Sequence, residues 1–463
     1  MYDEYVMINN EGNNLPPPPS LAKTLGPSFI LLGLALGSGE LILWPYLVSQ
    51  WGLGILWGGL LGVTLQFFLN TEAMRYTLAR GESVFVGFRK ISILIPIWYI
   101  LSTFIPWSIP GFSSASSQIF ARLFSVNETV IAVALLVATG LILTIGKTLY
   151  KTMEVLQKTI LLFGIPFIAI LVLLLTKRTD WVLALQGLVG KGDGWWFFPP
   201  GIGIFSFLGA FAYAGAGGNL NLAQSYYIKE KGFGMGKYTG KITSLFAKGS
   251  HEMQLEGTLF DENPENNKRW KQWWRVVNLE HFLVFWFLGF LTILMLAVLS
   301  KSLVYGKQLE SGLSFLFGES QAMQQQLHPF IGSLFLVAAG IMLFSTQTGV
   351  LESSTRIISE NVLLLFYKPG RKFNPSLAFY LALWSQIGLG IVVYLLGFKE
   401  PRLLITLSAV LNGAAMMVSF PLMYILNKKR LPKAYHPRLL RRFALLAGFL
   451  FFVVFVMLTL LNP

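Results

Sequence analysis

The chain has 463 residues, of which 54% are hydrophobic and only 13% are charged, whereas soluble domains carry about 25% charged residues. A soluble protein of this composition could not cover its surface with polar groups, and the mean hydropathy of +0.60 agrees. The composition therefore excludes a soluble globular enzyme, and the absence of cysteine excludes disulfides and thiolate metal sites. Because the apolar residues fall in blocks of about 20 or more, each block can cross a membrane as a helix. We expect an all-α integral membrane protein.

Eleven transmembrane helices are predicted after a polar, proline-rich tail at residues 1–25. Pro106 and Pro110 fall inside the third of them, which is long, and predict a kinked or tilted helix, because proline removes a backbone donor. The predicted spans are 27–49, 53–74, 91–121, 128–146, 155–176, 200–227, 277–300, 329–351, 375–398, 403–426 and 441–461.

The distribution of Lys and Arg predicts the topology. With the N-terminus inside, 28 of the 36 basic residues lie in inner segments and 8 in outer segments. By the positive-inside rule, we expect a multi-pass protein of the plasma (inner) membrane with a cytoplasmic N-terminus and an outside C-terminus. This topology accounts for most of the net charge of +14, so no nucleic-acid partner is expected beside the lipid bilayer.

The longest inner segment, the cytoplasmic loop 228–275, ends in the run Lys268-Arg269-Trp270-Lys271-Gln272-Trp273-Trp274-Arg275. Basic residues interleaved with Trp favour a helix at the anionic inner leaflet. An ordinary interfacial anchor is the simpler interpretation, and a regulatory lipid site is the alternative.

Two spans carry glycine clusters near their middles, Gly37-Ser38-Gly39 in the first and Gly215-Ala216-Gly217-Gly218 in the sixth. Each Gly costs a helix interior about 1 kcal/mol relative to Ala, so the clusters predict interrupted helices. Close packing through small residues is the alternative for either cluster alone. Both clusters occupy the first helix of a five-helix half, and an odd number of helices gives the halves opposite orientations. Paired interruptions in inverted halves indicate a transporter site at the membrane midplane.

This pattern divides the chain into a first inverted repeat at 26–176, a second at 200–426 and an additional helix at 441–461. The substrate-binding candidates are the residues at the two predicted interruptions: Gly37, Ser38, Gly39, Glu40, Tyr213, Ala216, Gly217, Gly218, Asn219 and Asn221.

Glu40 is the only acidic residue within the hydrophobic part of a predicted span. Carboxylates inside a membrane are costly and usually functional, so Glu40 is expected to ligate a cation, carry a proton or pair with a substrate ammonium. A structural hydrogen bond is the alternative. Glu352 and Arg356, at i and i+4, are expected to form a pair on a helix surface.

With these residues identified, the chain resembles the Nramp family of divalent-metal transporters. The resemblance rests on Gly26-Pro27-Ser28-Phe29, Asn219-Leu220-Asn221-Leu222-Ala223-Gln224-Ser225, Ser345-Thr346-Gln347-Thr348-Gly349 and Phe420-Pro421-Leu422. It implies a LeuT-type 5+5 inverted repeat with interrupted helices 1 and 6, and a secondary transporter that works by alternating access. It implies neither an enzyme nor a cofactor.

The sequence departs from this family at its metal-binding positions. The Asp of the first helix stands here as Gly37, the Asn as Glu40, and the Met of the sixth helix as Ala216. No acidic residue lies from Trp98 through Phe120, where the family has acids for proton exit, and the usual Gln of helix ten stands as Ala409 or Asn412.

The altered residues leave a site of oxygen donors, with Glu40 and Asn219 as the tentative metal ligands. Such a site suits a hard divalent cation such as Mg²⁺ or Mn²⁺, and without the helix-three acids we expect transport without strict proton coupling. The alternative is a small organic solute such as an amino acid, because Gly37-Ser38-Gly39 is similar to the break of amino acid–polyamine–organocation transporters.

Overall fold

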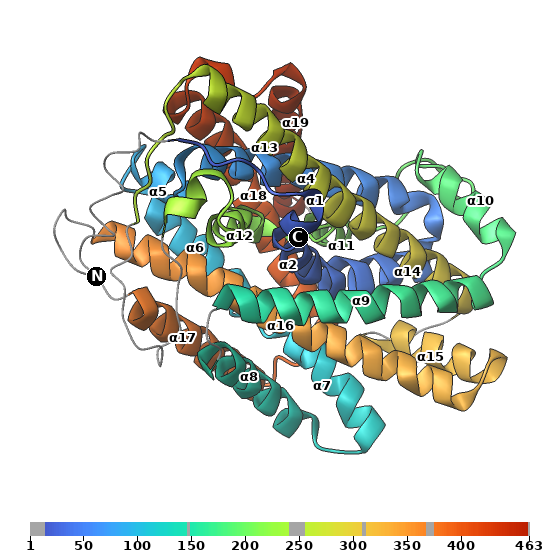
Figure 1. Ribbon diagram of the computed structural model, residues 1–463. Helices are drawn as coiled ribbons and strands as arrows, with labels where there is room; N and C mark the ends of the chain where they lie inside the picture. The colour runs from blue at the N-terminus through green and yellow to red at the C-terminus, as the bar shows by residue number, and fades with distance from the viewer. Residues whose placement is uncertain (1–13, 146–148, 240–254, 308–311, 367–374, 462–463) are drawn as a thin grey trace.

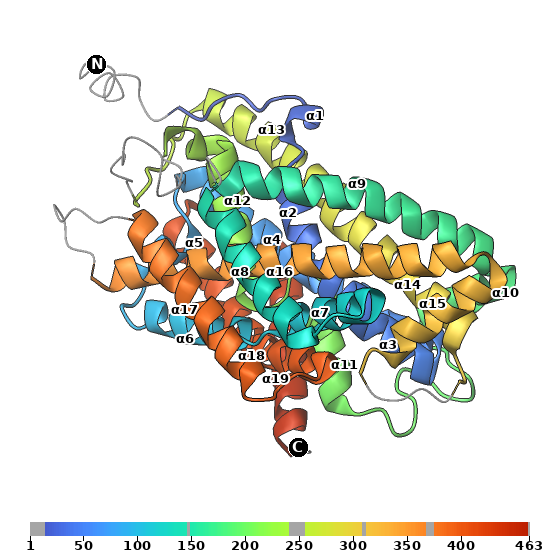
Figure 2. The ribbon, with the colours of Figure 1, turned by 90° about the horizontal axis from the view of Figure 1, so that it is seen from below.

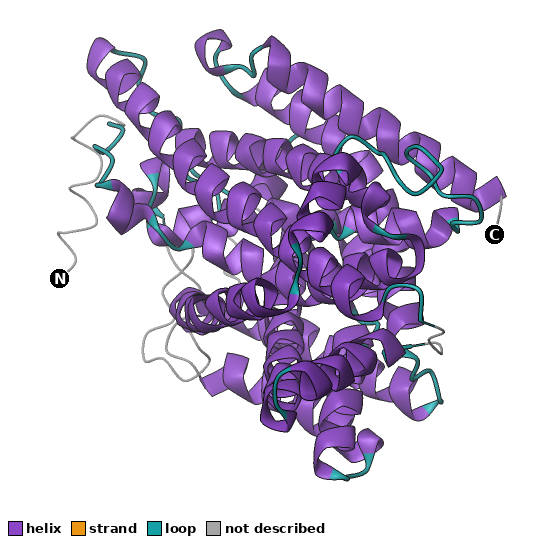
Figure 3. Ribbon diagram, turned by 90° about the vertical axis from the view of Figure 1, so that its right-hand side faces the viewer, coloured by secondary structure: helices purple, strands orange, loops and turns teal. Residues whose placement is uncertain are grey.

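The computed structural model describes residues 14–145, 149–239, 255–307, 312–366 and 375–461. Within these ranges the regular structure is helical throughout and contains no β-strand, which confirms the all-α prediction (Figure 3). The α-helices are α1 (Leu21–Thr24), α2 (Pro27–Ala35), α3 (Trp44–Trp51), α4 (Leu56–Arg80), α5 (Val84–Arg89), α6 (Ile95–Trp107), α7 (Gly111–Phe124), α8 (Glu128–Ile145), α9 (Leu149–Leu175), α10 (Arg178–Gly187), α11 (Ile204–Ala212), α12 (Gln224–Lys231), α13 (Pro264–His281), α14 (Gly289–Val304), α15 (Ser314–Gln326), α16 (Pro329–Leu365), α17 (Pro375–Leu395), α18 (Pro401–Arg430) and α19 (Leu439–Leu461).

Shorter helical segments of other types join or extend these helices. The π-helices are η2 (Leu36–Leu43) and η6 (Phe282–Leu288), and the 3₁₀ segments are η3 (Leu53–Ile55), η4 (Gly218–Ala223), η5 (Gly234–Tyr238) and η7 (Lys433–Tyr435).

Nine helical runs among the described residues are long and apolar enough to cross a membrane. The two remaining predicted spans, 91–121 and 200–227, are each divided into shorter helices: α6 and α7 in the first, α11 and α12 in the second. The division after α6 falls at Pro110, directly before α7, so the predicted kink of the third span is confirmed.

The first span lies at the centre of the molecule, where α2 is surrounded by other helices (Figure 1, Figure 2). In the most apolar window of Pro27–Trp51, 94% of the residues are buried, against 28% for Leu439–Leu461. The segment η2 contacts α11, α14, α16 and α18. The additional helix α19 packs mainly on α18 at the periphery.

The two predicted interruptions differ in form. In the first span the backbone stays helical but widens into η2, where the Trp44 amide donates to the Gly39 carbonyl five residues back. In the sixth span α11 ends at Ala212 and η4 begins at Gly218, so residues 213–217 form a true break. The expected unwinding is therefore found in the sixth span, while the first span keeps its hydrogen bonds through a π-helix, a form that recurs at functional sites.

The predicted pair of Glu352 and Arg356 is present, but it is not on a helix surface. Both side chains are buried, and Arg356 also pairs with Glu230 of α12. Tyr227 donates to Glu352, at 2.9 Å. The pair is buried because Tyr227 and Glu230 of α12 reach this face of α16, a tertiary contact that the pattern of a single helix does not reveal.

This cluster makes a testable prediction. Arg356→Met should strongly lower the thermal melting temperature, because it leaves two buried carboxylates without their cation, a loss of about 3–5 kcal/mol. Glu352→Gln should be milder, since it keeps the Arg356–Glu230 pair. Equal melting temperatures for Arg356→Met and the wild type would contradict a structural role for the cluster.

Candidate functional site

The two distorted segments touch each other at the centre of the molecule. A Cβ atom added at Gly39 of η2 would overlap the backbone carbonyl of Tyr213, the first residue after α11. The close approach therefore requires glycine at this position, and it brings the first span directly against the break of the sixth.

Thr346 of α16 forms two hydrogen bonds with the backbone of the first span. Its hydroxyl accepts a hydrogen bond from the Gly37 amide at 3.1 Å and donates to the Gly33 carbonyl at 2.9 Å. Gly33 and Gly37 are separated by four residues and would bond directly in an α-helix. The Thr346 hydroxyl therefore bonds to both of these backbone groups where the helix widens into η2.

Gln66 of α4 likewise forms hydrogen bonds with backbone groups at the break of the sixth span. Its amide nitrogen donates to the Ala212 carbonyl, and its carbonyl oxygen accepts from the Gly217 amide, each at 3.1 Å. The same oxygen accepts from the Asn221 side chain at 3.0 Å. One buried side chain thus bonds backbone groups on both sides of the break.

Glu40 is fully buried and its side chain faces α14. Thr292 donates to one carboxylate oxygen, Oε2. The other oxygen, Oε1, has no hydrogen-bond partner among the described residues, and a Cβ at Gly289 of α14 would lie 3.6 Å from it. No Lys, Arg or His of the described chain forms an ion pair with Glu40.

A chain of hydrogen bonds connects the break to the tenth span, α18. The Asn412 amide donates to the Tyr213 hydroxyl at 3.1 Å, and this hydroxyl lies 2.7 Å from Ser408 Oγ. Ser408 donates in turn to the Pro106 carbonyl at the end of α6. The ring of Trp107 stacks on Tyr213, with ring centroids 5.4 Å apart.

The structure gives Glu40 and Asn219 different surroundings. Asn219 donates to Ser102 and Thr103 of α6 and accepts from Ser419 of α18. Both are buried, but Glu40 faces α14 whereas Asn219 faces α6 and α18.

The remaining candidates lie in or beside the two segments. Gly37 and Ser38 belong to η2, while Ala216 and Gly217 belong to the break. Gly217 and Gly218 have φ values of +79° and +52°, which explains their glycine character. A Cβ at Gly217 would meet the Tyr213 ring, and one at Gly218 would overlap the Asn412 side chain. Protein atoms therefore fill the space beside these glycines.

Sequence reasoning did not assign Gln66, Thr346, Thr292 and Asn412 to the site as binding or positioning residues. All four are buried polar side chains on apolar helices, and that pattern is usually satisfied by bonding between helices. Only the fold shows that they face the distorted segments. Between Ala409 and Asn412, it is Asn412 that faces Gly218 and Tyr213.

Comparison with known proteins shows the fold. No protein-family model matches the chain, and no curated protein matches it by sequence. Crystal structures of variants of a manganese transporter from Eremococcus coleocola match with TM-scores of 0.70 and 0.69 at 12% identity, covering 98% of this chain and 90% of theirs. A nucleobase-cation-symport-1 family transporter in a closed conformation matches with a TM-score of 0.52 at 13% identity, covering 97% and 95%. The chain shares the LeuT-type fold of these transporters.

The role of Thr346 is testable by paired substitutions. Thr346→Val should lower the melting temperature, because it leaves the buried amide of Gly37 and carbonyl of Gly33 without partners, at about 1–3 kcal/mol for each. Thr346→Ser keeps the hydroxyl and should restore most of the loss. A Val variant as stable as the wild type would mean that the two backbone groups bond directly once the hydroxyl is removed.

The close approach at Gly39 is testable with a matched glycine. Gly39→Ala should abolish transport, because the added methyl group must push the first span away from Tyr213. Gly388→Ala on α17 is the control, since a Cβ there meets no atom within 4 Å. Equal uptake by the two variants in proteoliposomes would contradict the importance of this contact.

Proposed function

We propose that the chain is a secondary transporter that moves a hard divalent cation, such as Mg²⁺ or Mn²⁺, by alternating access. The observation that carries the proposal is Glu40, a fully buried carboxylate with one unpartnered oxygen, beside the contact between η2 and the break of the sixth span. The similarity of this fold to that of a manganese transporter also supports a divalent metal cation as the substrate.

The electrostatics of Glu40 favour a cationic substrate. A buried carboxylate is costly unless a positive charge compensates it. Glu72 and Glu352 are equally buried, but each pairs with arginine. Glu40 has only the Thr292 hydroxyl. A bound cation would supply the missing positive charge.

The oxygen atoms beside the two distorted segments favour a hard cation over a soft one. Besides Glu40 Oε1, the buried oxygens Asn221 Oδ1 and Asn412 Oδ1 have no hydrogen-bond partner among the described residues. Amide and carboxylate oxygens suit Mg²⁺, Ca²⁺ and Mn²⁺. The described chain contains no cluster of three His, Asp or Glu side chains that could hold a metal. A single carboxylate therefore favours a partly hydrated ion over a fully stripped one.

The proposed transport cycle uses the inverted repeats at 26–176 and 200–426, with the N-terminus inside and the C-terminus outside the plasma membrane. Glu40, Tyr213, Asn219 and Asn221 are all buried in this conformation, so the site must open alternately to each side. Tentative cation ligands are Glu40 and Asn219, with the backbone of Gly37, Ser38, Gly39, Ala216, Gly217 and Gly218 lining the site. Transport is expected to follow the cation gradient and the membrane potential without strict proton coupling.

The packing at the glycines bears on the alternative of an organic solute. Cβ atoms at Gly215, Gly217 and Gly218 would each meet protein side chains, so the glycines serve close packing in this conformation. An amino acid would need space that these side chains occupy. The cation is the better fit to the observed geometry.

The test is uptake of Mg²⁺, Mn²⁺ and Ca²⁺ into proteoliposomes by the wild type and by Glu40→Gln. The substitution keeps the shape of the side chain but removes its charge, so uptake should fall about tenfold or more, the factor that a loss of about 1.4 kcal/mol produces. Glu319→Gln is the matched control, because Glu319 of α15 is another buried carboxylate with an unpartnered oxygen.

Three outcomes would contradict the proposal. Absence of cation flux in a folded wild type would favour the organic solute, and amino acids would be assayed next. Equal uptake by Glu40→Gln and the wild type would remove Glu40 from the site. Substrate-dependent acidification of the vesicle lumen would show proton coupling.

A further inference from the structure

A cavity of about 620 Å³ lies beside α13, away from the two distorted segments. It is enclosed by the C-terminal part of α4, the tryptophan-rich part of α13, the turn η7 and the first turn of α19. Four cationic side chains line it: Arg75, Lys271, Arg438 and Arg441. None of its lining residues in the described chain is acidic.

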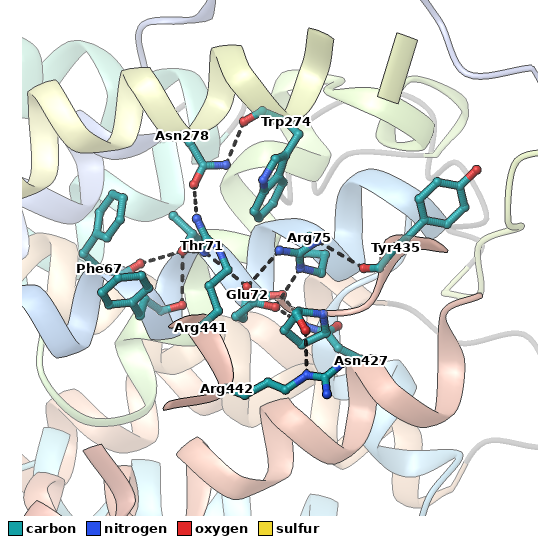
Figure 4. A network of polar contacts seen from close by, with 12 residues as sticks. Phe67, Thr71, Glu72, Arg75, Trp274, Asn278, Asn427, Tyr435, Arg441 and Arg442 are labelled. Atoms are coloured by element: carbon teal, nitrogen blue, oxygen red, sulfur yellow. Dashed lines mark hydrogen bonds and ion pairs between the residues drawn. The ribbon is translucent and has the colours of Figure 1, made fainter. Parts of the chain in front are cut away.

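Glu72 fixes two of these cations in place (Figure 4). Arg75 donates to both carboxylate oxygens, at 2.7 and 3.1 Å, and Arg441 donates to one of them at 3.1 Å. Asn427 donates to the same carboxylate at 2.9 Å, and Arg441 also donates to Asn278. The two guanidinium groups are therefore held rigidly by a carboxylate whose own hydrogen bonds are satisfied.

The ring of Trp274 lies against both of these guanidinium groups. Its ring centroid lies 3.9 Å from Arg75 Cζ and 4.7 Å from Arg441 Cζ. Trp270 stacks on Trp274 at 6.1 Å and packs against Tyr435 at 5.0 Å. Stacking of this kind orients the guanidinium planes, and their edges are bonded to Glu72, to Asn278 and to the Tyr435 carbonyl.

Lys271 and Arg438 complete the charge of the cavity. Both are exposed, and neither forms a hydrogen bond or ion pair through its side chain within the described chain. Glu72 pairs with two of the four lining cations, so the four cations and this one carboxylate together carry an excess of three positive charges. The acidic patch at Asp261, Glu262 and Glu265 is exposed and does not line the cavity.

We propose that this cavity binds the phosphate of an anionic phospholipid at the cytoplasmic leaflet. Fixed arginines beside unpaired cations are the arrangement that recognises phosphate groups. Basic pockets between helices on the cytoplasmic side are suited to lipid headgroups. The N-inside topology inferred from Lys and Arg places all four lining segments on that side.

Two features favour a lipid over a free phosphate ion. The helical run Pro264–Val304 has 41 residues, about 60 Å at 1.5 Å per residue, which is twice the hydrocarbon thickness of about 30 Å. Its first turns, which carry Trp270 and Trp274, therefore reach headgroup level. An apolar groove of about 370 Å³ begins at Leu439 and Arg442, which directly follow Arg438 and Arg441 of the cavity in the chain. The groove continues along Phe443 and Leu446 and suits an acyl chain.

The experiment measures the melting temperature of the purified full chain in neutral detergent with added phosphatidylglycerol, phosphatidylcholine or inorganic phosphate. Phosphatidylglycerol should raise the melting temperature of the wild type, because a ligand that binds the folded state stabilises it. Lys271→Gln/Arg438→Gln should respond only at about tenfold higher lipid concentration. The variant should fold normally, since neither side chain has a partner to lose. Arg438→Gln alone should show a smaller change in the same direction.

Lys268→Gln/Arg275→Gln is the matched control, because it removes two exposed charges of α13 that do not line the cavity. Its response should equal that of the wild type. Equal weakening in the two double variants would show a general effect of charge and overturn the proposal. A wild-type response to phosphatidylcholine as large as that to phosphatidylglycerol would overturn it too. An equal response to inorganic phosphate would overturn the lipid assignment.

Discussion

The centre of this molecule depends on one constraint: every backbone N–H and C=O that leaves the α-helical ladder must find another partner. The apolar interior offers no water for this purpose, and each unsatisfied group would cost several kcal/mol. Thr346 meets the requirement in the first span, and Gln66 meets it in the sixth. In the third span, Ser408 donates to Pro106 and Gln347 accepts from the Ser113 amide. Side chains from neighbouring helices thus satisfy backbone groups at three distorted segments.

This arrangement concentrates polar atoms in a place that is otherwise hydrophobic. The same side chains that satisfy the backbone also connect the second, eighth and tenth spans to the distorted segments. Asn412 and Ser408 of α18, Tyr213 of the break and the Pro106 carbonyl of α6 form one hydrogen-bonded chain. A change at either distorted segment must therefore shift these partners as well, which couples the site to the helices that surround it.

Charge is distributed in two distinct ways. Towards the end of the molecule where α12 and α16 meet, buried carboxylates are compensated by arginine, as in the cluster of Glu230, Glu352 and Arg356. Beside η2, Glu40 has no cationic partner in the described chain and only one hydroxyl donor. Near α13 the balance is reversed, with more cations than carboxylates around one cavity. Compensated charges stabilise the fold, whereas Glu40 and the basic cavity are the two places where we propose that a charged ligand binds.

Local features of the sequence suffice to predict the all-α membrane class and the positions of the two distorted segments. Apolar length and glycine clusters are local properties, and they suffice because a membrane admits few backbone forms. Glu40 was also identified from the sequence, because an acidic residue within an apolar span is costly anywhere. The widening of the first span into a π-helix is a feature of the tertiary structure, where the Thr346 hydroxyl, from a helix more than 300 residues later, bonds to the Gly37 amide. The partners of Glu40 and Asn219, the burial of Arg356 and the basic cavity likewise depend on which helix faces meet, and a local pattern cannot encode that.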